Sequence, residues 1–282
     1  MKKLIKIVLF VSMLAVQSQS SFAQDDVDRS VVEIAKDVYR LQNNNHFSMV
    51  VITSEGAVVV DPINADAASW IKSEVANLTD KPITHLIYSH SHGDHASGGT
   101  VLAQDAEVIV QANAPDEIDG VIADTRFAYE YEFSAGDKSF ELTWLGPGHG
   151  TDLIAVVVRP ANVGFITDAV TPKRLPWRDF GGANVDDMIA QIEKIESLDF
   201  ETLIPAHGYV GVKSDAADVR VYLEVLKTEV LTGLKDGQSV DELKESILMS
   251  DYKDWLGYEN WLQLNVEGMV NFLTSSGQFN PE

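Results

Sequence analysis

The sequence contains no cysteine and few basic residues, with 21 lysines and arginines against 43 aspartates and glutamates in 282 residues. The lack of cysteine excludes disulfides, thiolate nucleophiles, iron–sulfur clusters and sulfur ligands from cysteine in a metal site. The net charge of −22 argues against nucleic-acid partners, because binding to phosphate backbones requires a cationic surface. Hydrophobic residues make up 45% of the chain, so the acidity does not indicate disorder. The composition indicates an acidic globular protein.

The N-terminal segment has the pattern of a secretory signal. Three lysines precede the apolar run Ile7–Val16, and the small-residue site Ser21-Phe22-Ala23 follows it. A helix that spans a bilayer needs about 20 apolar residues, so this run is too short to be one. We therefore predict that residues 1–23 are a signal peptide, that no stable membrane anchor remains, and that the mature protein is periplasmic or secreted.

Strand and helix patterns alternate through the rest of the chain. Strands are predicted at residues 48–53, 57–61, 84–89, 107–111, 139–144, 153–158, 163–167 and 202–205. Apolar residues at helical spacing predict helices over 65–78 and 185–198, and the pattern is helical from residue 214 onward with a break at Gly237. With no linker, this alternation predicts one α/β domain over residues 24–282, whose C-terminal part, 214–282, is helical.

Three histidines and an aspartate lie together in the motif HSHGDH at residues 90–95, directly after a predicted strand. On an extended chain His90 and His92 project to the same side, and Gly93 allows a turn that brings Asp94 and His95 to a neighbouring point. Burial of an unpaired polar group costs about 1–3 kcal/mol, which a divalent metal ion would offset. The motif predicts a metal site. The alternative is a solvated histidine-rich loop.

Three further residues lie beyond the ends of predicted strands. His149 is part of the motif LGPGHG, Asp168 ends the predicted strand before it, and His207 is part of LIPAHG. Each of them alone would be read as a structural turn or capping residue. Together with residues 90–95 they form one candidate site, because α/β folds gather their sites at strand ends.

This ordered set of residues resembles the metallo-β-lactamase superfamily across the mature chain. The motifs that carry the resemblance are Asp61, His90-x-His92-x-Asp94-His95, His149, Asp168 and His207. The resemblance implies a four-layer αββα sandwich with a pair of Zn²⁺ ions at one edge of the sheets, or iron or manganese in their place. Outside these motifs it weakens, so it indicates the fold and the site better than the substrate.

The resemblance also implies a role for each residue of the set. The first metal would be bound by His90, His92 and His149. The second would be bound by Asp94, His95 and His207, and Asp168 would bridge the two. Asp61 would be a carboxylate behind the ligands that orients their loop, or a cap of the turn before Pro62.

The function implied is that of a dinuclear zinc-dependent hydrolase in which a metal-bridging hydroxide cleaves a small ester, thioester, lactone or lactam. Asp94 would be the catalytic residue that orients the hydroxide and transfers a proton. A β-lactamase proper is disfavoured, because one lactamase subgroup has a cysteine at the position of Asp168 and a second lacks the bridging acid. Two further alternatives are an iron-dependent oxidoreductase of the same fold and a non-catalytic metal-binding module.

The loop that follows Asp168 is a candidate for substrate binding. It combines aromatic residues with three cations in a chain that has few, and its candidate contacts are Lys173, Arg174, Trp177 and Arg178. These residues could clamp a carboxylate of a small-molecule substrate, or belong to an ordinary surface loop. His46 could reach the site but is a weak candidate ligand, and His85 is predicted to be a core histidine. The sequence does not indicate an oligomeric state.

Overall fold

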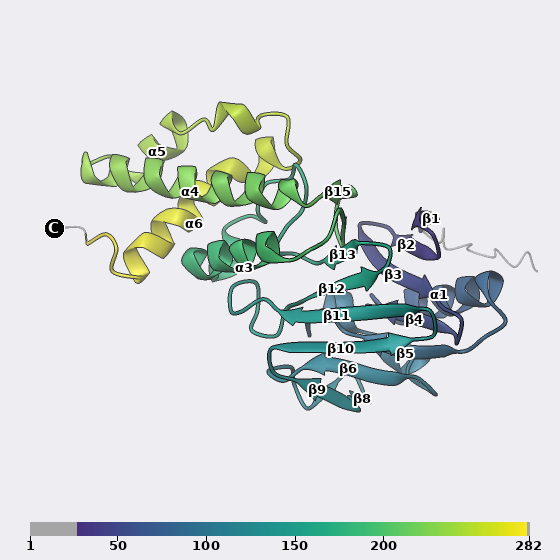
Figure 1. Cartoon of the computed structure of the whole chain (residues 1–282). Helices are drawn as coiled ribbons and strands as arrows, with labels where there is room; N and C mark the ends of the chain where they lie inside the picture. Colours follow the sequence, from purple (N-terminus) through teal and green to yellow (C-terminus); the bar gives the residue numbers. More distant parts are fainter. Residues whose placement is uncertain (1–26, 281–282) are drawn as a thin grey trace, which may run out of the picture.

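The computed structural model describes residues 27–280 (Figure 1). The predicted signal peptide, residues 1–23, lies outside this range. Among the residues described, none of the helices combines the length and the apolar character needed to cross a membrane.

The N-terminal half of the chain forms a seven-stranded sheet. Its strands lie in the order β1-β2-β3-β4-β5-β6-β9, antiparallel from β1 to β4 and parallel from β4 to β9. Their bounds are β1 Arg29–Ala35, β2 Val38–Asn43, β3 His46–Ile52, β4 Ala57–Val60, β5 Ile83–Ile87, β6 Glu107–Gln111 and β9 Thr125–Phe127. The short strands β7, Glu117–Ile118, and β8, Val121–Ile122, pair with each other beside it.

The second half of the chain forms a six-stranded sheet in the order β10-β11-β12-β13-β14-β15. Its strands are β10 Glu130–Ala135, β11 Lys138–Trp144, β12 Ile154–Arg159, β13 Val163–Ile166, β14 Thr202–Pro205 and β15 Gly211–Val212. All neighbours are antiparallel except β13 and β14, which are parallel. The helix α3, Val185–Ser197, connects these two parallel strands.

Helices cover the outer face of each sheet (Figure 1). The helix α1, Ala65–Leu78, packs on the seven-stranded sheet, and α3 packs on the six-stranded sheet together with the C-terminal helices. The remaining helices are α2 Gly93–Ala96, η1 Gly99–Val101, η2 Phe180–Gly182, α4 Ser214–Lys235, α5 Val240–Ser246, η3 Ser250–Tyr252 and α6 Tyr258–Ser275.

Three apolar layers hold these elements together, one between the sheets and one under each group of helices. Central strands contribute to two layers because successive side chains point to opposite faces. In β12, Val156 faces the other sheet while Ala155 and Val157 face the helices. Such strands are buried on both faces, so they are continuous runs of apolar residues. The architecture is the αββα sandwich that the sequence predicts.

The central elements match their predicted ranges closely. The strands β1, β2, β7, β8, β9, β10 and β15 were not predicted, and α6 lies inside the part of the chain, 214–282, that was predicted to be helical without separate bounds. Most side chains of β1 are exposed or half-buried, so this edge strand has no apolar alternation to identify it. Four predicted strands were too long at their C-terminal ends, and those predicted over 48–53 and 84–89 end at Ile52 and Ile87. The strand predicted over 163–167 ends at Ile166, so Asp168 lies two residues beyond it, and the strand predicted over 57–61 ends at Val60. Both aspartates have positive φ angles, which regular strands exclude.

Candidate metal centre

The fold brings the predicted site residues to one edge of the sandwich. His90 follows β5, His149 lies in the loop between β11 and β12, Asp168 follows β13 and His207 follows β14. Asp94 and His95 belong to the single turn α2, which begins directly after His92. Because each residue lies just past a strand, the sheets determine its position while the loops set the direction of its side chain.

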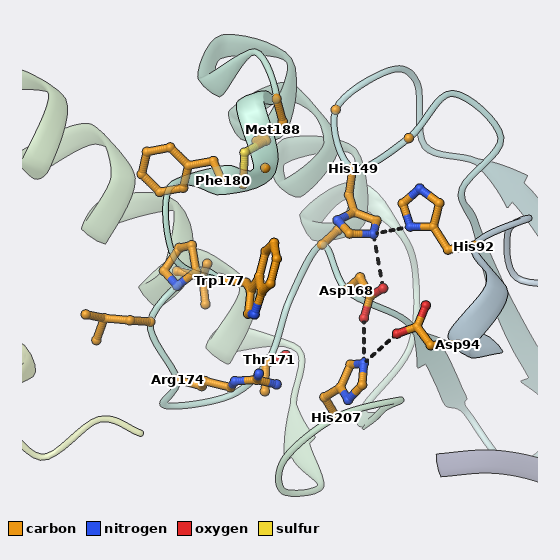
Figure 2. A pocket seen from close by; sticks show the side chains of 18 of the residues that line it. His92, Asp94, His149, Asp168, Thr171, Arg174, Trp177, Phe180, Met188 and His207 are labelled. Carbon is orange, nitrogen blue, oxygen red and sulfur yellow. Dashed lines mark hydrogen bonds and ion pairs between the residues drawn. The ribbon is translucent and has the colours of Figure 1, made fainter. Parts of the chain in front are cut away.

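Asp168 lies at the centre of this group (Figure 2). Its Oδ2 atom is 3.4 Å from Nε2 of His90, 3.3 Å from Nε2 of His95 and 3.1 Å from Nε2 of His149. Its Oδ1 atom is 3.3 Å from Nε2 of His207. Burial would raise the pKa of Asp168, but His149, His90 and His95 together hold it far below its usual range. The carboxylate is therefore ionised and is shared between two sets of histidines.

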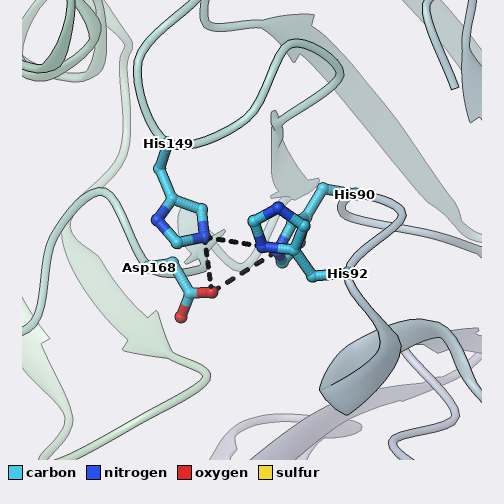
Figure 3. Close-up of side chains that lie close together, drawn as sticks. All are labelled: His90, His92, His149 and Asp168. Carbon is cyan, nitrogen blue, oxygen red and sulfur yellow. Dashed lines mark hydrogen bonds and ion pairs between the residues drawn. The ribbon is translucent and has the colours of Figure 1, made fainter. Parts of the chain in front are cut away.

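The first set consists of His90, His92 and His149 (Figure 3). Their donor atoms and a carboxylate oxygen of Asp168 all lie within 4.8 Å of one another. Nδ1 of His92 is 3.0 Å from Nε2 of His149. Burial lowers the pKa of His90 to about 4, so this ring is neutral near neutral pH. The ring nitrogen without a proton then has a free lone pair that can bind a metal ion.

The second set consists of Asp94, His95 and His207. Oδ2 of Asp94 is 3.5 Å from Nε2 of His95 and 4.0 Å from Nε2 of His207. The donor atoms of His95, His207 and Asp168 lie within 4.8 Å of one another. Burial opposes charge on His95, but the carboxylates of Asp168, Asp61 and Asp94 raise its pKa to about 9.

Buried polar atoms without partners show that a cation fits here. Nε2 of His90 and both ring nitrogens of His95 are buried and have no hydrogen-bond partner among the described residues. Each buried polar atom without a partner destabilises the folded protein by about 1–3 kcal/mol unless it binds a ligand. Imidazole nitrogens and carboxylate oxygens are the donors that Zn²⁺, Fe²⁺ and Mn²⁺ accept in proteins. The donor set and its burial therefore suit divalent metal ions.

Asp61 lies behind the ligands and is fully buried. It accepts hydrogen bonds from the backbone N–H of Ser89 at 2.8 Å and from the Ser89 hydroxyl at 2.6 Å. The Ser89 oxygen lies 3.0 Å from Nδ1 of His90, so this nitrogen donates and Nε2 points to the site without a proton. Asp61 Oδ2 is also 3.7 Å from Nδ1 of His95. Burial raises the pKa of Asp61 to about 6. These contacts place Asp61 behind His90 and His95, and its orienting role stays a prediction.

Two further residues that hold predicted ligands in place were not identified from the sequence. Gln191, buried in α3, accepts a hydrogen bond from the backbone N–H of His149 and donates one to the carbonyl of Gly146, both at 2.7 Å. A side chain at Gly148 would collide with Gln191, so the loop needs glycine there. The carbonyl of Asn45 accepts a hydrogen bond from Nδ1 of His207 at 2.7 Å, which leaves Nε2 free. Gln191 belongs to no motif that could have revealed it, whereas Asn45 directly precedes His46, in a segment that the sequence already suggested could reach the site.

His46 also lies in the site. Its Nε2 atom is 3.3 Å from Oδ2 of Asp94, and its ring centroid is 4.7 Å from that of His207. His85 lies apart from this group on β5, where its ring stacks on Phe133. The structure thus brings six of the seven histidines to one site, including the one that the sequence made a weak candidate.

A cavity of about 700 Å³ opens beside these residues. Part of its wall is the loop after Asp168, and Figure 2 shows Arg174, Trp177 and Phe180 around it. Of the four predicted substrate contacts, Arg174 and Trp177 line the cavity, whereas Lys173 and Arg178 are exposed and do not. The guanidinium of Arg174 lies 4.8 Å from the centroid of the Trp261 ring. The loop therefore presents one cation and several apolar side chains to the site.

Residues 43–207, which are more than half of the chain and include every predicted metal ligand, match the Metallo-beta-lactamase superfamily. The chain belongs to this superfamily. It is 26% identical over 208 residues to the 2,4-dinitroanisole O-demethylase subunit alpha of Nocardioides sp., covering 67% of this chain and 61% of that protein. This chain thus spans about three fifths of the length of that relative. It is 24% identical over 193 residues to a UPF0173 metal-dependent hydrolase of Rhizobium johnstonii, covering 57% of this chain and 82% of that one.

Solved structures share this superfamily fold. A metallo-beta-lactamase from Pontibacter korlensis superposes with a TM-score of 0.62 at 20% identity, covering 70% of this chain and 99% of that chain. The inverting sec-alkylsulfatase Pisa1 from Pseudomonas sp. superposes with a TM-score of 0.70 at 12% identity, covering 90% of this chain and 52% of that chain. At these identities the likeness establishes the fold alone.

Proposed function

We propose that the protein is a metal-dependent hydrolase with a dinuclear centre, and that zinc is its metal. The observation that carries the proposal is the position of Asp168, whose carboxylate contacts histidines of both sets. His90, His92 and His149 would hold one ion, and Asp94, His95 and His207 the other, with Asp168 shared between them. The name of the Rhizobium relative, a metal-dependent hydrolase, supports this assignment.

Two divalent cations at this site would acidify a bound water molecule and polarise the bond to be cleaved. Asp94 is the residue best placed to handle the proton. Its side chain is 52% exposed and lines the cavity. Hydrogen bonding from His46 lowers its pKa well below the ordinary value, so Asp94 is ionised and can orient the attacking water. It can then accept a proton and pass it to the leaving group.

We propose as substrates small esters, thioesters, lactones or lactams that carry an anionic group. Arg174 is the only one of the three loop cations that lines the cavity, and within residues 27–280 it forms no salt bridge that would neutralise it. Burial lowers its pKa, but a guanidinium stays charged at neutral pH. Trp177, Phe180 and Met188 provide an apolar wall beside it. Export to the periplasm, predicted from residues 1–23, would give the enzyme access to such molecules from outside the cell.

The proposal is tested on the purified mature chain by metal analysis and a substrate panel. The panel contains chromogenic esters, thioesters, lactones and lactams, together with an aryl methyl ether and a secondary alkyl sulfate suggested by the names of two similar proteins. We expect two zinc ions per chain, turnover that a chelator abolishes and zinc restores, and loss of turnover in Asp168→Ala. The control variant is Glu193→Gln, an exposed residue of α3.

Other outcomes would support the alternatives. Iron in the purified protein together with oxygen uptake would favour an oxidoreductase. Two bound metals without turnover of any panel member would favour a metal-binding module. Turnover that Asp168→Ala leaves unchanged would exclude the proposed dinuclear hydrolysis.

A further inference from the structure

His46 is a titratable residue that the proposed centre does not use, although it lies inside it. The donor atoms of His46, Asp94 and His207 all lie within 4.8 Å of one another. Oδ2 of Asp94 has three imidazole nitrogens around it, at 3.3 Å for His46, 3.5 Å for His95 and 4.0 Å for His207. The nitrogen of His46 is the nearest of the three. This cluster resembles the arrangement around Asp168, in which one carboxylate is surrounded by imidazoles.

The two shorter separations, 3.3 Å and 3.5 Å, match those between neighbouring ligands of one metal ion. Metal–donor distances of about 2.0–2.2 Å, with angles between neighbouring donors from about 90° to the tetrahedral value, place those donors about 2.8–3.6 Å apart. The 3.3 Å between Nε2 of His46 and Oδ2 of Asp94 equals the 3.3 Å between Nε2 of His95 and Oδ2 of Asp168. By distance alone, His46 is therefore placed as well as the histidines predicted to be ligands.

The backbone holds His46 in this place. His46 is the first residue of β3 and follows a tight turn in which Asn44 has a φ of 56°. The carbonyl of Asn45 accepts the hydrogen bond from His207. On the other side of His46, the backbone N–H of Phe47 donates to the carbonyl of Ala206 at 2.9 Å. The neighbours of His46 are thus bonded to His207 and to the residue before it, which fixes the two rings relative to each other.

We propose that His46 is an additional ligand of the second metal ion, beside Asp94 and His207. This inference rests on the proposed function, since it requires a metal at Asp94, His95 and His207. With His46 the second ion would have five protein donors, against four for the first ion. A site with more donors suits a cation of higher coordination number, so the two sites would differ in metal preference as well as in affinity.

A purely structural role for His46 is the alternative that the experiment must separate. In that role His46 would only donate a hydrogen bond to Asp94 and orient it. Glutamine can keep such a hydrogen bond but is a poor ligand for zinc, whereas alanine can do neither. His46→Gln and His46→Ala should therefore behave alike if His46 is a ligand, and differently if it only orients Asp94. The matched control is His85→Gln, because His85 lies outside the site.

The measurement is the zinc affinity of each site, determined by competition with a chromophoric chelator on the full chain, with folding checked by circular dichroism. We expect both His46 variants to bind the first zinc normally and to lose more than about 100-fold in affinity for the second, beyond the roughly 10- to 100-fold that loss of an orienting partner causes. His85→Gln should bind both ions as the wild type does.

Normal second-site affinity in His46→Gln would overturn the inference. A variant-free test is a crystal structure of the zinc-loaded wild type, in which a Zn–Nε2 distance of about 2.1 Å at His46 is expected. The ligand role would be contradicted if His46 contacted only Asp94 and its Nε2 atom lay too far from the zinc ion to bind it. Wild-type protein that binds fewer than two zinc ions would instead refute the proposed dinuclear function, and with it this inference.

Discussion

The side chain of Gln191 binds the loop of His149 at two points, accepting from the His149 N–H and donating to the carbonyl of Gly146. Both bonds are 2.7 Å long, and Gln191 is buried in α3 among apolar residues. A helix on the outer face of the six-stranded sheet thus positions a predicted ligand at the edge of the sandwich. The loop itself is rich in glycine and has little intrinsic rigidity, so these two bonds limit its motion.

We expect Gln191→Leu to weaken the first metal site while leaving the second intact. Leucine fills a similar volume but makes neither hydrogen bond, so the loop would lose its anchor and His149 its position. Loss of such an orienting partner typically lowers metal affinity by about 10- to 100-fold. Chelator competition on Gln191→Leu and on the exposed control Glu193→Gln would measure this. Equal first-site affinities in the two variants would show that the loop holds His149 without Gln191.

Zinc binding at the two sites should release different numbers of protons. His95, with a pKa of about 9, is protonated at neutral pH in the metal-free protein, whereas His90, with a pKa of about 4, is already neutral. Because zinc binds only neutral imidazole, loading the second site must displace the proton of His95. The affinity of the second site should rise by about tenfold per pH unit from pH 7 and level off near pH 9, while that of the first site stays nearly constant.

Calorimetric titration in buffers of different protonation enthalpy would count these protons. We expect about one proton to be released with the second zinc ion and almost none through His90 with the first. Equal release at both sites would mean that the carboxylates around His95 do not raise its pKa as the structure indicates.

Elements with a regular apolar pattern could be predicted from the sequence, and edge strands without such a pattern could not. The ranges of α1, β6 and β14 agree with prediction residue for residue, because their apolar patterns report burial directly. The edge strand β1 carries mostly exposed or half-buried side chains and leaves no such signal.

At the site, too, the sequence predicted some residues and not others. The motif at residues 90–95 predicts a metal cluster because its members are adjacent in sequence. His46 is brought there by the contact between the start of β3 and the segment after β14, which only the folded chain reveals. Of the loop cations, Lys173 and Arg178 are exposed and do not line the cavity, and no pattern of residue types distinguishes them from Arg174.

The C-terminal helix α6 anchors the loop that walls the cavity, through one buried residue. Asn265 accepts a hydrogen bond from the Tyr222 hydroxyl at 2.7 Å and donates to the carbonyls of Pro176, at 2.9 Å, and Arg178. We expect Asn265→Leu to lower the free energy of unfolding by about 1–3 kcal/mol, because the buried Tyr222 hydroxyl loses its partner. Urea unfolding would measure the loss.

The double variant Tyr222→Phe/Asn265→Leu tests this explanation. It removes both partners, so its cost should be smaller than the sum of the two single costs. Additive costs would show that the two side chains stabilise the protein independently. A higher KM with an unchanged kcat in Asn265→Leu is also expected, since the cavity wall would lose its support while the proposed ligands stay in place.

Arg174 should determine the preference for anionic substrates. For a panel substrate that carries a carboxylate, we expect Arg174→Gln to raise KM by roughly 10- to 100-fold, the range of a lost charged hydrogen bond of about 1.5–3 kcal/mol. The methyl ester of the same carboxylate should be cleaved equally by wild type and variant, because it offers no charge to Arg174. Lys173→Gln is the matched control, since Lys173 is adjacent in sequence but exposed outside the cavity. If Lys173→Gln and Arg174→Gln raised KM alike, the effect would come from the net charge of the loop and not from a contact in the cavity.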